Sequence, residues 1–389
     1  CRRASPSGRK SSRFTAMSAV EGHPMDQPPR VGLPGVRVAT AIPARTASAS
    51  RRAVRGRDTS ERLIEWGAMS KFGCLVTGGA GFIGSHVAER LVHDGHRVRV
   101  VDNLSTGSEA NLTHLRNDLE FMLGDLRDPL VCNRAVEGTE LVFHLAAMPS
   151  VPRSMEDPRG CHEHNVDATV NLVLAGRDAG ARRVVFSSSS SVYGDNPALP
   201  KVESAELQPK SPYAAAKLAG EQYVVALARA GMIEGVALRY FNIFGARQSP
   251  TSAYAAVVPV FMAAALAGTA APIHGDGQQT RDFTYIDNAV SANLLAATGA
   301  ADQVSGRICN VGAGQRTSLL ELVEQIGEVT GRPLQVEHLP SRAGDVRDSL
   351  ASLDRASAVL GYQPLVSLRE GLERTWAWFA PSAGAAPTS

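Results

Sequence analysis

Cysteine is scarce in this sequence, and its few cysteines follow no paired spacing. The 389 residues hold five: Cys1, Cys74, Cys132, Cys161 and Cys309. A disulfide framework or a structural zinc site needs an even or closely spaced set. The scattered, odd set therefore predicts reduced thiols in a cytoplasmic protein, with Cys74 buried on the first strand.

One short stretch does carry metal-binding residue types. Cys161, His162, Glu163 and His164 follow one another directly. Consecutive residues of a helix point around its axis instead of toward one ion. We therefore expect no metal site.

Long apolar runs and a strong net charge are also missing. No stretch of eighteen apolar residues or secretory h-region is present, so we expect no membrane partner. The formal net charge is +2, but the charges are unevenly distributed. Residues 1–68 hold 13 of the 40 basic and 5 of the 38 acidic residues, so residues 69–389 hold 27 basic and 33 acidic residues. That larger part is mildly acidic and has no electrostatic footprint for nucleic acid.

Residues 1–68 are rich in Arg, Ser, Ala, Pro and Gly and show no apolar periodicity. Three interpretations compete: a disordered or non-native extension, an organelle transit peptide, and a basic arm for anionic partners. We favour the first, because no amphipathic helical pattern supports a transit peptide and Met69 stands just before the first predicted strand.

A glycine cluster follows that strand. Gly78, Gly81 and Gly84 are three residues apart, and a helical pattern begins near Phe82. Glycines let the backbone approach a pyrophosphate, and the N-terminus of a helix attracts its charge. Asp102 ends a second strand about twenty residues on, which completes a dinucleotide-binding fingerprint.

From about residue 72 to 245, apolar strands alternate with helical segments, which predicts an α/β fold with a Rossmann-like, doubly wound parallel sheet. The expected strands are 73–77, 97–101, 119–123, 141–146, 183–187 and 236–240, and the expected helices include 83–94, 129–136, 160–179 and 213–230. We assign 69–245 to an NAD-binding domain and 246–378 mainly to a smaller substrate-binding domain. A helix over 282–297 would return to the sheet, and 379–389 would be a disordered tail.

The strongest catalytic pattern is Tyr213 followed by Lys217 at the start of a predicted helix. Residues four apart share a helical face, and a nearby cation lowers the pKa of a phenol toward that of a general base. Five serines, 187–191, end the preceding strand, where one hydroxyl can bond both a substrate and the tyrosine.

These motifs, in this order, resemble the extended short-chain dehydrogenases/reductases of the NAD-dependent nucleotide-sugar epimerase/dehydratase family. The resemblance covers about 71–378 and rests on residues 77–84, 102–107, 124–126, 144–147, 165, 187–194, 213, 217 and 239–242. It implies a catalytic triad of Ser189, Tyr213 and Lys217, with Ser189 chosen by counting back from residues 192–194.

The resemblance implies NAD as cofactor, and Asp102 favours NAD over NADP because a carboxylate binds ribose hydroxyls and repels a 2′-phosphate. The implied cofactor-binding residues are Gly78, Gly81, Phe82, Ile83, Gly84, Asp102, Asn103, Ser105, Thr106, Gly107, Asp125, Leu126, Leu145, Ala146, Ala147, Asn165, Ser187, Tyr213, Lys217 and Tyr240.

Within the family, dehydratases carry Asp-Glu after the catalytic Ser or Thr, and related decarboxylases carry Glu there. This chain has Ser190 and Ser191, which favours 4-epimerisation through a transient 4-keto sugar. The implied substrate-binding residues are Ser150, Arg153, Ser189, Asn242, Val257, His274, Arg281, Arg342, Asp345 and Ser349.

The sugar pocket gives a finer expectation. Ser349 stands where galactose-restricted epimerases carry a bulky tyrosine, so the pocket has room for a 2-acetamido group. We expect UDP-N-acetylglucosamine and its C4 epimer as substrates, and UDP-glucose as a possible further one. The alternatives are a UDP-glucuronate 4-epimerase or other nucleotide-sugar enzyme of the family, and, from another class, a non-catalytic NAD-sensing protein. The family also implies a homodimer formed by helices 160–179 and 213–230.

Overall fold

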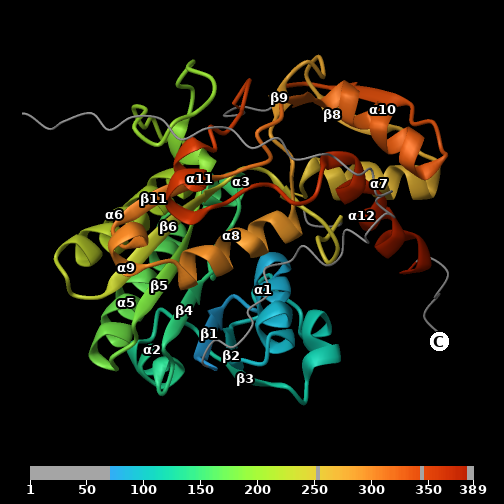
Figure 1. Cartoon of the computed structure of the whole chain (residues 1–389). Helices are drawn as coiled ribbons and strands as arrows, with labels where there is room; N and C mark the ends of the chain where they lie inside the picture. The colour runs from blue at the N-terminus through green and yellow to red at the C-terminus, as the bar shows by residue number, and fades with distance from the viewer. Residues whose placement is uncertain (1–70, 251–254, 342–345, 383–389) are drawn as a thin grey trace, which may run out of the picture. The chain divides into compact units, whose positions relative to one another are not determined.

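The computed structural model describes residues 71–250, 255–341 and 346–382, all within one compact unit that spans 58–389 (Figure 1). Residues 1–68, whose nature the sequence left open, lie outside the described part. The expected division near residue 245 stays a prediction. Among the helices described, none has the length and apolar character needed to cross a membrane.

Seven parallel strands form the central sheet, in the order β11-β6-β5-β4-β1-β2-β3. Their bounds are β1 Gly73–Thr77, β2 Arg97–Asp102, β3 Leu119–Leu123, β4 Leu141–His144, β5 Arg183–Ser189, β6 Glu234–Tyr240 and β11 Arg307–Val311. The predicted parallel sheet is confirmed. The strand order reverses between β1 and β4, which is where ligands bind in such sheets.

Helices cover both faces of the sheet, and each face has its own apolar core. One face holds α1 (Phe82–His93) and α8 (Ile286–Thr298), and the other holds α2 (Pro129–Val136), α5 (Ala168–Asp178) and α6 (Pro212–Arg229) (Figure 1). Arg183 of β5 is buried and donates to three carbonyls at the end of α8, those of Ala296, Ala297 and Gly299. This contact fastens α8 to the sheet.

Two predicted helices differ in detail. The segment expected over 160–179 consists of α4 (Pro158–His162), a π-helical turn (Glu163–Asp167) and α5. The helix expected from 282 begins at Ile286, because Thr284–Tyr285 forms strand β10 and pairs with β7 (Ile243–Phe244). Strand pairing therefore overrides the helical pattern there.

The second part of the chain consists of short pairs and helices: β8 (Ala271–His274) with β13 (Val336–Leu339), β9 (Thr280–Arg281) with β12 (Thr317–Ser318), α7 (Val257–Ala267), α10 (Leu319–Thr330) and α12 (Leu368–Ser382). Smaller elements are η2 (Glu109–Leu115), α3 (Val151–Glu156), η4 (Ser190–Tyr193), α9 (Ala301–Val304) and α11 (Asp354–Leu360). The prediction of a disordered tail over 379–389 is wrong for residues 379–382, because α12 continues to Ser382 and Phe379 is buried.

Candidate active site

A cavity of about 1570 Å³ runs along the carboxyl ends of the strands. Most of the residues singled out from the sequence line it: Gly78, Gly81, Phe82, Ile83, Gly84, Asp102, Asn103, Ser105, Thr106, Asp125, Leu126, Leu145, Ala146, Ala147, Ser150, Arg153, Ser187, Ser189, Tyr213, Lys217, Tyr240, Asn242, Arg281 and Ser349. Residues from many separate segments of the chain thus line one cavity.

The glycine turn packs tightly against the loop that follows β4. Gly78 has φ +66°, and a Cβ there would lie 2.8 Å from Cα of Ala146. A Cβ on Gly84 would lie 2.2 Å from the carbonyl oxygen of Gly78. Both positions therefore require glycine, and the turn leaves its backbone beside the cavity at the start of α1, as pyrophosphate binding needs.

Asp102 lines the cavity, and two backbone N–H groups fix the orientation of its carboxylate. Its Oδ2 accepts from the Ala80 N–H at 3.0 Å and its Oδ1 from the Leu104 N–H at 2.8 Å. Each oxygen keeps a further lone pair for a ribose hydroxyl, so the site fits NAD. Gly107 does not line the cavity. A Cβ on it would lie 3.0 Å from Oδ2 of Asp102, so this glycine closes the space behind the carboxylate.

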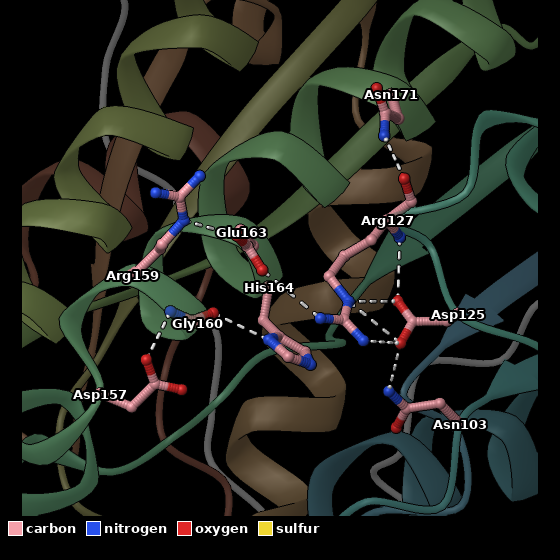
Figure 2. A network of polar contacts seen from close by, with 9 residues as sticks. All are labelled: Asn103, Asp125, Arg127, Asp157, Arg159, Gly160, Glu163, His164 and Asn171. Carbon is pink, nitrogen blue, oxygen red and sulfur yellow. Dashed lines mark hydrogen bonds and ion pairs between the residues drawn. The ribbon is translucent and has the colours of Figure 1, made fainter.

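Figure 2 shows the polar contacts around Asp125, at the end of the cavity expected to hold adenine. Asn103 donates to Asp125 at 3.1 Å and Arg127 donates at 2.8 Å, and the hydrogen bonds from Arg127 hold the pKa of this carboxyl well below its usual range. Arg127 also lies 3.5 Å from Glu163 of the π-helical turn. His164 lines the cavity beside this network and bonds the Gly160 carbonyl through Nδ1 at 2.8 Å.

Asn165 does not line the cavity, which corrects its expected contact with the cofactor. It is 2% exposed, and its Oδ1 accepts from the Met148 N–H at 2.9 Å. Its Nδ2 donates to Sγ of Cys161 at 3.2 Å. Asn165 therefore positions the loop after β4, which does line the cavity, and the π-helical turn points its side chain inward.

A series of buried hydrogen bonds connects the loop after β4 to Thr77 at the end of β1. The Thr169 hydroxyl donates to the main-chain carbonyl of residue 165 at 2.7 Å, so it accepts from Nε2–H of His144 at 2.9 Å. Nδ1 of His144 then accepts from the Thr77 hydroxyl at 2.8 Å. The Thr77 oxygen in turn accepts from the N–H groups of Leu145 and Ala146, both at 3.1 Å. Burial lowers the pKa of His144 to about 3, so this imidazole is neutral.

The start of α6 positions the expected catalytic pair. Ser211 caps the helix by accepting from the Ala214 N–H at 3.1 Å, and Pro212 takes the first helical position. Tyr213 and Lys217 follow one turn apart on the cavity side. The Lys217 ammonium is buried and donates to the Ser187 carbonyl at 2.8 Å.

The structure does not reproduce the lowered pKa expected for Tyr213. Burial raises the pKa of Tyr213 to about 12, and a hydrogen bond with Ser189 offsets part of this rise. Burial also lowers the pKa of Lys217 to about 8. The Lys217 ammonium donates a hydrogen bond to the Ser187 carbonyl and lies 5.1 Å from the centre of the Phe186 ring. An oxidised nicotinamide bound in the cavity would supply a further positive charge.

The serine run continues β5 to Ser189 and then forms η4. Ser189 contacts Tyr213 and accepts from the Ser191 hydroxyl at 2.9 Å. Ser188 donates to Oε2 of Glu221 at 2.7 Å, inside the protein. The count that chose Ser189 therefore selects the serine that hydrogen-bonds the tyrosine.

The residues expected to bind the UDP part of the substrate line two adjoining cavities. A second cavity of about 250 Å³ is lined by Val257 and His274, and it shares Asn242 and Arg281 with the main one. This arrangement fits a base in the smaller cavity and a diphosphate at its mouth. Arg342 and Asp345, expected at the diphosphate and ribose, lie outside the described residues.

Several cavity-lining residues were missed from the sequence, among them Lys201, Lys210, Arg247, Gln248 and Trp378. They lie in connecting segments or near the end of α12, where no periodic pattern marks them. The stretch from Arg247 to Val257 resembles UDP-N-acetylglucosamine 4-epimerases, but that resemblance assigned no role to Arg247 or Gln248. Only Arg247 has an unusual backbone, with φ +65°, and that is not readable from sequence.

Residues 74–312 match the model of the NAD dependent epimerase/dehydratase family. The UDP-glucose 4-epimerase of Mycolicibacterium smegmatis is 42% identical over 309 residues, which cover 78% of this chain and 97% of that protein. Among solved structures, the UDP-N-acetylglucosamine 4-epimerase of Methanobrevibacter ruminantium in complex with UDP-N-acetylmuramic acid has 38% identity and TM-score 0.76, covering 81% of this chain and 100% of the other. The Thermus thermophilus UDP-glucose 4-epimerase with NAD has 35% identity and TM-score 0.73, covering 81% and 100%.

Proposed function

The chain belongs to the NAD-dependent epimerase/dehydratase family, and we propose that it interconverts UDP-N-acetylglucosamine and UDP-N-acetylgalactosamine by epimerisation at C4. At the coarser level it is an NAD-dependent UDP-sugar 4-epimerase. The observation that supports the acetamido sugar is Ser349, a small side chain that lines the cavity and is 9% exposed.

The glycine turn and Asp102 would hold NAD, which would supply a reversible hydride acceptor for C4 of the sugar, so the reaction would have no net redox change. Tyr213 takes the proton of the 4-hydroxyl and gives it back to the 4-oxygen after the keto sugar has turned over. Ser189 hydrogen-bonds the tyrosine, and the Lys217 ammonium, one turn further along α6, donates to the Ser187 carbonyl.

The residues after Ser189 support epimerisation over elimination. Loss of water from the hexose needs an additional acid and base near C5 and C6. Ser190 and Ser191 occupy that stretch, and the Ser191 hydroxyl is already bonded to Ser189. Neither serine offers a carboxyl group for proton transfer, so the keto sugar would be reduced again without losing water.

The proposal is tested by incubating the purified protein with UDP-N-acetylglucosamine and no added NAD. We expect UDP-N-acetylgalactosamine to accumulate to an equilibrium mixture, with one NAD retained per active chain. Turnover of UDP-glucose alone would overturn the assignment of the acetamido sugar. Loss of all turnover in the presence of bound NAD would favour the NAD-sensing alternative.

A homodimer is part of the same proposal. The outer face of α6 exposes Ala215, Gln222 and Ala226, and Tyr223 is 49% exposed. Small side chains on one helix face allow another helix to approach closely. Size-exclusion chromatography with light scattering should give a mass near twice that of one chain. A mass equal to that of one chain would contradict the proposed homodimer.

A further inference from the structure

Lys201 is a buried lysine on the wall of the main cavity. It is 2% exposed, close to the 3% of the catalytic Lys217. Its ammonium donates to the main-chain carbonyl of Asn196, which is a neutral acceptor. A lysine ammonium has three donors and is costly to bury without a countercharge.

No carboxylate of the described residues lies within ion-pair distance of Lys201. Two described carboxylates act on the Lys201 charge, and both have other partners: Asp195 pairs with Lys210, and Asp348 accepts from Thr280 at 2.5 Å. Burial lowers the pKa of Lys201, and the charges of Asp195 and Asp348 offset only part of this shift. Among the described residues, none therefore supplies a countercharge to this ammonium.

The backbone puts Lys201 next to the segment that shapes the sugar pocket. Its N–H donates to the Leu350 carbonyl at 2.7 Å, and its carbonyl accepts from the Ser352 N–H at 2.9 Å. These bonds bridge Lys201 to Ala351, two residues after Ser349. Lys201 and Ser349 thus line the same cavity from adjacent segments, together with Ser190 and Gly194.

We propose that Lys201 binds a carboxylate carried by the hexose, so that this site accepts an acidic UDP-hexose as well as a neutral one. The inference rests on the proposed UDP-sugar epimerase site and deepens its substrate class. A carboxylate would complete a charge-assisted hydrogen bond in a place shielded from water, whereas a neutral sugar offers only hydroxyl or amide groups.

The experiment compares Lys201→Met with the wild-type enzyme on three UDP-sugars. UDP-N-acetylglucosamine is neutral, UDP-glucuronate carries its carboxylate at C6, and UDP-N-acetylmuramate carries it on the substituent at O3. We measure kcat/KM for the neutral sugar and, for each acidic one, kcat/KM or the inhibition constant. The acid that depends on Lys201 identifies the position that the lysine reaches.

We expect the wild-type enzyme to bind at least one acidic sugar, and Lys201→Met to weaken that binding roughly tenfold or more, as for a lost charge-assisted bond. The loss on the neutral sugar should be smaller than on the acidic one, because the neutral sugar presents no carboxylate to this lysine. Lys201→Arg, which keeps the charge, should restore most of the affinity. Lys210→Met is the matched control: its ammonium already pairs with Asp195, so the ratio of acidic to neutral affinity should not change.

An equal loss on acidic and neutral sugars would overturn the inference and leave Lys201 as a tether for the loop at Asn196. Failure of the wild-type enzyme to bind either acidic sugar would overturn it as well, even if Lys201→Met does not fold. If UDP-N-acetylglucosamine is not turned over but an acidic sugar binds through Lys201, only the proposed acetamido specificity fails.

Discussion

Glu221 and Arg239 form an ion pair whose side chains are 0% and 1% exposed, directly behind the serine run. The guanidinium donates to both carboxylate oxygens, at 2.6 Å and 2.9 Å, and also to the Tyr193 hydroxyl at 2.9 Å. Because Ser188 donates to the same carboxylate, the pair holds the strand that carries Ser189 in place.

Glu221→Leu should lower the free energy of unfolding by about 3–5 kcal/mol, because it leaves the Arg239 charge buried and unpaired. Urea unfolding at pH 7 measures the loss, and Glu221→Leu combined with Arg239→Met should recover much of it. The matched control is Arg369→Met, which breaks the exposed pair with Glu328 and should cost much less than the buried pair. Equal costs at the two sites would contradict a stabilising role for the buried pair.

Tyr213→Phe should reduce kcat about 10²–10⁴-fold, because it removes the hydroxyl that transfers the proton. The ring and its packing against Met148, Cys161 and Ala216 remain, so the amount of NAD retained after purification should not change. Cofactor content is read from absorbance after denaturation. A variant that keeps full turnover would show that another group acts as the base.

His144 should make the stability of the protein fall in acid. Its pKa is about 3 in the folded protein against about 6.5 in an unfolded chain, so between these values the unfolded state binds more protons. Stability therefore rises with pH across this window, by about 1.4 kcal/mol per unit where the unfolded histidine is protonated.

The measurement compares unfolding free energies of the wild type and His144→Asn from pH 5 to pH 7. The asparagine variant should be less stable at pH 7, and the difference between the two proteins should shrink as the pH falls. A difference that stays constant with pH would mean that the pKa of His144 is not lowered in the folded state.

Ser349→Tyr should remove activity on UDP-N-acetylglucosamine and spare activity on UDP-glucose, if that sugar is turned over. The tyrosine ring would fill the space that Ser349 leaves open beside the sugar, where the acetamido group needs room. Ser349→Ala is the control, because it keeps the space and should change the ratio of the two activities by less than about threefold. Equal losses on both sugars would count against the pocket argument.

Much of the fold was readable from the sequence. Strand β1 is buried along its whole length and is a continuous apolar run, and β1, β3 and α2 were all predicted at their observed bounds. The helix start at Phe82 followed from the glycine cluster before it, and the acidic end of β2 from the spacing of about twenty residues to Asp102. Such features depend on neighbours within a few residues and need no tertiary information.

Other features depended on partners far along the chain. The sequence could not place Asn165 inside the protein, because its partner Met148 is seventeen residues away, in the loop after β4. It also could not show that Thr284–Tyr285 pairs with β7, which stops α8 from starting earlier.

The glycine turn and Asp102 determined from sequence alone that this chain has a dinucleotide-binding fingerprint, and the Tyr213–Lys217 spacing predicted a proton-transfer pair, because each motif is a local arrangement of a few residues. Only the tertiary structure decided which of the five serines contacts Tyr213 and that burial, more than Lys217, sets the pKa of its phenol. It also brought Lys201 beside the segment of Ser349. Burial and electrostatic environment are made by segments distant in the chain, so they exist only once those segments have packed together.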